Sequence, residues 1–203
     1  PGYKELSVGN HLFMTIQWML SSFANEGKAF FIAIWAAGFL LLVKSKKAKV
    51  YQSLAVVFSV VALLPYAGIS FFSEMGIGYI DIEQCLTELP SWQTMTTQNR
   101  IAFFWWIAAV RFTMVLLWKV TGHSVFISMA FLGGIASEAV LHFSPTIYAS
   151  GARVYYLTDL MYLFIILLMV MRMDSEKKKN LFIAGAAALR IINFLSQYSI
   201  MIL

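Results

Sequence analysis

The feature that most restricts this chain is a series of apolar segments separated by short polar stretches. Crossing about 30 Å of hydrocarbon as an α-helix takes roughly 20 residues, and six segments approach or reach that length. The predicted spans are 28–43, 50–72, 101–120, 123–143, 154–173 and 181–203. The sequence therefore predicts an all-α fold, a polytopic transmembrane helix bundle of about six spans.

Composition excludes the other broad classes of protein. Of the 203 residues, 60% are hydrophobic and 12% are charged, whereas a soluble domain has roughly 45–50% apolar and about 25% charged residues. The formal charge is +5, but the basic residues form short tracts beside apolar runs, where they set membrane orientation. We therefore expect membrane lipids as partners, and no nucleic acid.

Two regions differ in character along the chain. Residues 1–27 are predicted to form an outer loop and an interfacial helix, because the apolar stretch from His11 to Phe23 is too short to cross a bilayer comfortably. Residues 28–203 form the predicted transmembrane bundle. The chain opens on Pro1 and closes inside an apolar run, so we expect a piece of a longer protein.

Basic residues are concentrated in every second connecting loop. They follow the first, third and fifth spans: Lys44, Lys46, Lys47, Lys49, Lys119, Arg172, Lys177, Lys178 and Lys179. Cytoplasmic loops of membrane proteins carry an excess of Lys and Arg. Loops 44–49, 119–122 and 172–180 are therefore predicted to be cytoplasmic, and segments 73–100 and 144–153 external.

Four ionisable residues lie inside predicted spans: Arg111, Glu138, Asp159 and Arg190. A charge inside the bilayer is costly, so each of these side chains needs a partner or a water-filled cavity. One interpretation is a set of ion pairs that holds the bundle together. The other is a polar cavity that opens outward and suits an anionic or sugar-bearing ligand. The sequence leaves both open.

The segment between the fourth and fifth spans adds four candidates. Ser144 precedes a proline and favours a turn, and Arg153 lies where the next helix begins, so it could bind a phosphate or contact lipid headgroups. His142 shares a helix face with Glu138 and is either an acid–base group or a hydrogen-bonded spacer. Tyr155 could stack on a sugar or belong to an interfacial aromatic belt. No metal-ligand spacing is present, so no metal is predicted.

Residues 131–154 read FLGGIASEAVLHFSPTIYASGARV. This segment, about a tenth of the chain, resembles uncharacterised bacterial polytopic membrane proteins akin to the glucosyltransferases of surface-polysaccharide modification. The shared pattern is a small-residue helix that ends in Ser-Pro, a short outer loop, an arginine and another apolar helix. The opening Pro-Gly also resembles a turn in an earlier outer loop of that family, although Tyr3 and Glu5 depart from its Asn and Arg.

The resemblance implies the C-terminal half of a GT-C-like enzyme of the bacterial inner membrane. It implies a polyprenyl-phosphate-linked sugar as donor, a surface glycan as acceptor, no cofactor, and a catalytic carboxylate upstream of this chain. Arg153 and Arg111 would then hold the donor phosphate, while Glu138 and Asp159 would orient the arginines or sugar hydroxyls. Ser144, His142 and Tyr155 complete the predicted substrate site. A transporter or flippase component and a non-enzymatic assembly subunit are the alternatives.

Overall fold

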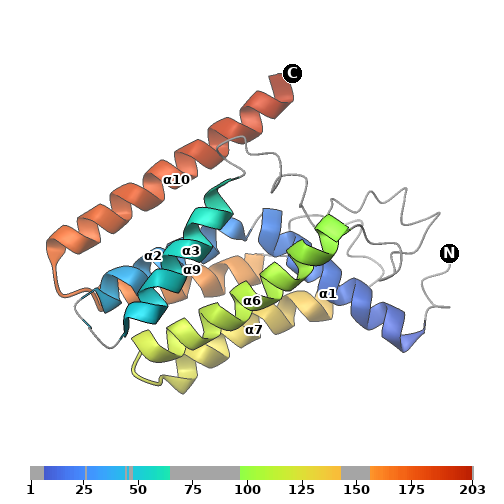
Figure 1. The fold of residues 1–203 in the computed structure, drawn as a ribbon, viewed down its shortest axis with the longest axis horizontal. Coiled ribbons are helices and arrows are strands. Elements are labelled where there is room, and N and C mark those ends of the chain that lie inside the picture. Colours follow the sequence, from blue (N-terminus) through green and yellow to red (C-terminus); the bar gives the residue numbers. More distant parts are fainter. Residues whose placement is uncertain are drawn as a thin grey trace.

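The computed structural model describes residues 7–25, 27–43, 45, 48–64, 97–142 and 156–202, and all regular structure within them is helical (Figure 1). The helices are α1 (Val8–Asn25), α2 (Lys28–Leu42), α3 (Lys49–Leu63), α6 (Thr97–Val120), α7 (Val125–His142), α9 (Tyr156–Met171) and α10 (Glu176–Ile202). The predicted all-α class is confirmed.

Every predicted span contains a helix, but several boundaries differ. The apolar stretch 11–23, which was predicted to form an interfacial helix, is part of α1. Helix α6 begins at Thr97, four residues before the predicted start at 101. Helix α10 starts at Glu176 rather than at 181, because a helix tolerates charged residues in its exposed first turn. Residues 65–72 of the predicted span 50–72 lie outside the described residues.

Length separates α6 from the other apolar helices of the described part of the chain. Within α6, the stretch Phe103–Val120 is both long and apolar enough to cross a membrane. Four apolar stretches are shorter: Lys28–Leu42, Lys49–Leu63, Val125–Val140 and Tyr156–Met171. By length and composition, the described residues thus hold one helix of membrane-crossing size.

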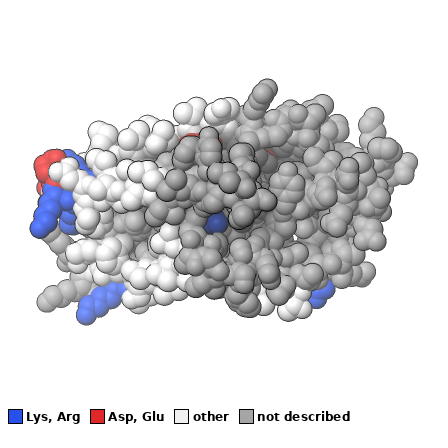
Figure 2. All heavy atoms as spheres, turned by 90° about the horizontal axis from the view of Figure 1, so that it is seen from above, with Lys and Arg blue, Asp and Glu red and all other residues white. Residues whose placement is uncertain are grey.

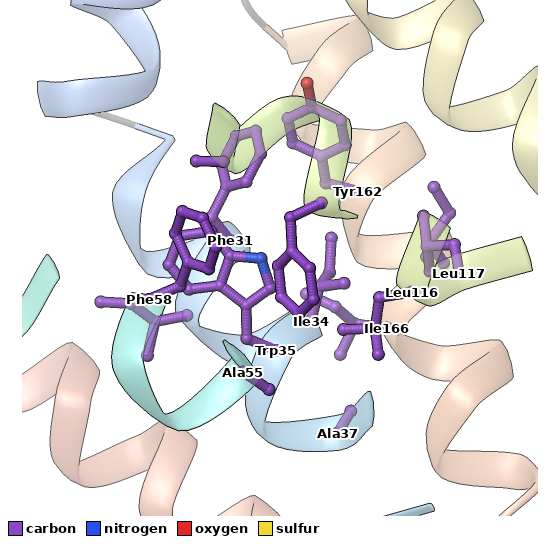
Figure 3. Close-up of a cluster of buried hydrophobic side chains, with 14 of the residues drawn as sticks. Phe31, Ile34, Trp35, Ala37, Ala55, Phe58, Leu116, Leu117, Tyr162 and Ile166 are labelled. Atoms are coloured by element: carbon purple, nitrogen blue, oxygen red, sulfur yellow. The ribbon is translucent and has the colours of Figure 1, made fainter. Parts of the chain in front are cut away.

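Helix α2 lies at the centre of the bundle and packs against α1, α3, α6, α9 and α10. Its sequence is apolar almost all the way round, which suits a helix with neighbours on every side. Phe31 and Trp35 of α2 are fully buried and contact each other at the middle of the core (Figure 3). Phe58 of α3 and Tyr162 of α9 pack onto this pair from two sides.

Two contacts bring α2 and α6 close together. The indole Nε1–H of Trp35 donates a hydrogen bond to Thr113 Oγ1 at 2.8 Å, and Thr113 Oγ1 donates to the Ala109 carbonyl at 2.7 Å. These bonds satisfy polar groups that would otherwise be buried in an apolar core. Gly38 allows the close approach, because a Cβ atom there would lie 2.7 Å from Leu116 Cδ2.

A tight turn reverses the chain between α6 and α7. Gly122 has φ +67° and His123 has φ +66°, both in the left-handed region. The His123 N–H donates to the Trp118 carbonyl at 2.9 Å, which satisfies an otherwise unpaired carbonyl at the end of α6. Glycine favours this conformation because it has no side chain.

The junctions α2–α3, α6–α7 and α9–α10 lie at the same end of the bundle, on the left of Figure 1. Lys178 Nζ donates to the Leu40 carbonyl at 2.7 Å, which joins the start of α10 to the last turns of α2. Charged side chains gather at this end, on the left of Figure 2. We call it the basic end, formed by Lys49, Lys119, Arg172, Lys177, Lys178 and Lys179 together with Asp174 and Glu176.

Candidate functional site

Helices α7 and α9 meet closely where α7 carries Gly134. A Cβ atom at this position would lie 3.4 Å from Tyr162 Cε1 and 3.7 Å from Thr158 Cγ2. At the neighbouring Gly133 a Cβ would meet nothing within 4 Å. Small residues commonly mark helix contacts in membranes, and here only the second glycine of the pair lies in the contact.

Hydroxyl groups link the two helices at this point. Thr158 Oγ1 of α9 donates to the Gly134 carbonyl of α7 at 3.1 Å, and Ser137 Oγ donates to the same carbonyl at 2.8 Å. The two hydroxyl oxygens lie 3.3 Å apart. The Gly134 carbonyl thus accepts bonds from both helices, one of them from Ser137 in the next turn of α7.

That next turn carries a carboxylate. Glu138 is 1% exposed although its helix is mostly apolar, and Asp159 of α9 is partly buried. Both carboxylates lie close enough to Tyr162 to act electrostatically on its hydroxyl. Ser137, Glu138, Thr158, Asp159 and Tyr162 therefore form one group, which we call the α7–α9 polar cluster.

Tyr162 occupies the boundary between this cluster and the apolar core. Its ring packs against Phe31 and Phe131, each with a centroid distance of 5.7 Å, and against Phe30 at 6.0 Å. Figure 3 shows its hydroxyl pointing away from the buried hydrophobic side chains. Among the described residues, neither this hydroxyl nor the buried Oε1 of Gln17 in α1 has a hydrogen-bond partner.

The cluster offers hydrogen-bonding chemistry inside an apolar surrounding. Carboxylate oxygens accept hydrogen bonds, and the Tyr162 hydroxyl can both donate and accept. A buried polar group without a partner costs free energy, which a bound hydroxyl-bearing ligand would offset. In the described part of the chain, no three His, Cys, Asp or Glu side chains gather in a way that could hold a metal.

The structure brings together two of the predicted site residues, Glu138 and Asp159. Arg111 lies elsewhere: it is exposed on α6, and its exposed neighbours Ile107 and Met114 are apolar. Within the described residues, no ion pair joins Arg111 to Glu138 or Asp159.

The remaining predicted residues cannot be placed within this geometry. Ser144, Arg153 and Tyr155 lie outside the described residues. His142 is the last residue of α7 and Arg190 belongs to α10, and only the backbone of each is described.

The sequence reasoning missed Ser137, Thr158 and Tyr162 as site residues. Their spacing from the predicted Asp159 could have indicated Thr158 and Tyr162. Tyr162 follows Thr158 by four positions and Asp159 by three, so the three side chains lie on neighbouring faces of one helix. Gln17 was missed as well, although it is a polar residue inside an apolar run.

Comparison of the chain with protein-family models, with curated proteins and with solved structures finds no match.

Proposed function

We propose that this chain is a multi-pass integral membrane protein with the six spans predicted from its sequence. The outward faces of the helices support this proposal, because their exposed side chains are apolar along most of the bundle. These exposed apolar side chains include Val57, Ile107, Met114, Val115, Phe126, Met129, Leu132, Val140, Leu160, Leu163 and Leu167. Soluble monomers rarely expose apolar surface this continuously, whereas lipid chains would cover it without cost.

The basic end gives the orientation in this proposal. It would face the cytoplasm under the positive-inside rule, which places segments 73–100 and 144–153 outside. The α7–α9 polar cluster would then lie toward the outer side, because Glu138 is close to the end of α7 and Asp159 close to the start of α9.

As its function, we propose the C-terminal module of a glycosyltransferase that uses a polyprenyl-phosphate-linked sugar to modify a cell-surface glycan. The observation that carries this proposal is the buried Glu138 carboxylate, which lies within electrostatic reach of a Tyr162 hydroxyl that has no hydrogen-bond partner among the described residues. Ionisable groups inside membranes are costly and usually functional. Carboxylate and hydroxyl groups are also the partners that sugar hydroxyls require.

The donor class comes from the resemblance of residues 131–154, which include Glu138. In this proposal Glu138, Asp159 and Tyr162 hold the sugar, and Arg153 holds the phosphate beside the start of α9. The chemical step would need a carboxylate supplied from upstream, so the role of this chain is to bind and orient the donor.

The test compares two ligands, a polyprenyl phosphate and its glucosyl ester, by tryptophan fluorescence of the solubilised chain. Glu138→Gln keeps the size of the side chain but removes its charge, and we expect it to weaken binding of the glucosyl ligand by about tenfold while polyprenyl phosphate binds as before. Arg153→Ala should weaken both ligands. Glu176→Gln is the matched control and should leave the ratio of the two affinities unchanged, because Glu176 is an exposed carboxylate at the basic end.

Two results would contradict the proposal. Unchanged binding of both ligands by Glu138→Gln, with a lower melting temperature, would show that the cluster only joins α7 to α9. Absence of saturable binding to the folded wild-type chain would exclude the donor class.

A further inference from the structure

A cavity of about 520 Å³ lies between α2, α3 and α10. Its walls are apolar except for the hydroxyl of Ser59: Ile32, Ala33, Ala36, Phe39, Leu40, Ala55, Val56, Ser59, Val60, Leu63, Leu181, Phe182, Gly185, Ala186 and Ala188. The α7–α9 polar cluster contributes no residue to this wall. The cavity is thus a second, separate feature of the bundle.

Small side chains on the facing helices create the space. Ala33 and Ala36 of α2 face Gly185 and Ala186 of α10 across it. A Cβ atom at Gly185 would meet nothing within 4 Å, so α10 does not close onto α2 at this point. Phe182, which is 7% exposed, packs α10 against the bundle near the basic end.

The volume suits a narrow chain better than another helix. An α-helix with its side chains is about 10–12 Å in diameter. A hydrocarbon chain is thinner and can run along the length of the space. The apolar lining offers such a chain contacts without leaving a polar group unsatisfied.

Positive charge lies at one end of the cavity. Leu40 belongs to the cavity wall, and its carbonyl accepts the hydrogen bond from Lys178 Nζ. Lys177 and Lys179 flank Lys178, and Glu176 pairs with Lys179 at 2.7 Å. Lys49 opens α3 at the same end. Lysines outnumber carboxylates here, which suits a phosphate group.

We propose that this cavity binds an anionic phospholipid, with one acyl chain between α2, α3 and α10 and its phosphate at Lys178 and the neighbouring lysines. The inference depends on the membrane location in the proposed function and is independent of the glycosyltransferase assignment. The apolar walls hold the hydrocarbon, and Lys178 with the neighbouring Lys177 and Lys179 selects a negatively charged headgroup.

The first test fills the cavity. Gly185→Leu places a side chain in open space, and Gly133→Leu is its control, because Gly133 is equally open but lies on α7 away from the cavity. Native mass spectrometry of the full chain, titrated with phosphatidylglycerol, measures lipid retention. We expect Gly185→Leu to lower the apparent affinity about tenfold and Gly133→Leu to leave it unchanged. Equal retention by both variants would overturn the proposal.

The second test removes the charge. Wild type should retain phosphatidylglycerol better than phosphatidylcholine with the same acyl chains, and Lys178→Gln should reduce that preference severalfold, while Lys119→Gln should not. Equal retention of the two lipids by wild type would overturn the headgroup assignment. A dimer that Gly185→Leu abolishes would identify a second copy as the occupant and overturn the proposal. Flotation of each variant with vesicles tests membrane location separately.

Discussion

The two sides of α2 differ in how closely their neighbours pack. Toward α6, Gly38 lets the backbone approach so closely that a Cβ atom would lie 2.7 Å from Leu116. Toward α10, Ala33, Ala36 and Gly185 leave a cavity of about 520 Å³. Small residues therefore have opposite effects here: they permit contact where two helices converge, and they leave space where the helices diverge.

The close and the loose helix contacts also differ in their hydrogen bonds. The close α2–α6 contact contains the Trp35–Thr113 hydrogen bond. The close α7–α9 contact, elsewhere in the bundle, contains the hydrogen bonds of Ser137 and Thr158 to Gly134. In the described residues, α10 contacts α2 through a polar bond only at Lys178, at the basic end. Hydrogen bonds thus accompany the close contacts, where apolar surroundings strengthen them.

The largest expected effect is that of Gly38→Leu. The new side chain would overlap Leu116, which is fully buried. We expect a loss of about 3 kcal/mol in the free energy of unfolding, measured by SDS or thermal unfolding in detergent. Gly185→Leu should stay within about 0.5 kcal/mol of wild type. Equal losses in the two variants would remove the contrast between the sides of α2.

The next largest effect is expected for Gly134→Leu. Its side chain would push against Tyr162 and Thr158 and would separate α7 from α9. We expect a loss of about 2 kcal/mol, whereas Gly133→Leu, one residue away, should change stability by less than about 0.5 kcal/mol. The same unfolding assay measures both variants, and similar values would mean that α7 faces α9 differently.

Thr113→Val tests the polar part of the α2–α6 contact. Valine has the shape of threonine but leaves the Trp35 N–H buried without its acceptor. We expect a loss of about 1 kcal/mol. In the double variant with Trp35→Phe, the loss from Thr113→Val should become smaller, because no indole N–H is left unpaired. Strictly additive losses would indicate that the bond contributes nothing.

Arg111→Leu should have the smallest effect on stability, within about 0.5 kcal/mol. Arg111 is exposed and has no ion pair among the described residues, so its removal breaks no described contact. If Arg111 binds the donor phosphate as the sequence suggests, the variant should lose polyprenyl-phosphate affinity while its melting temperature is unchanged. A large drop in melting temperature would place Arg111 in a structural contact instead.

The helical segments could be predicted largely from hydropathy. The helical class and the limits of α2 and α7 follow from the lengths of the apolar runs, within about two residues. The candidate site was only partly predictable. Glu138 and Asp159 are conspicuous because they are charged, whereas Tyr162 is one of many aromatic residues, and only its contacts distinguish it.

The sequence by itself determined which segments form helices and where charge is concentrated, because both depend on local composition. The tertiary structure alone decided which side of each helix meets a neighbour. Helices α2 and α7 are apolar nearly all the way round, so no stripe of hydrophobic residues reveals their orientation. The packing of side chains against adjacent helices therefore determined that Gly134 is in contact and Gly133 is not, that Tyr162 lies within electrostatic reach of Glu138, and that Arg111 lies apart.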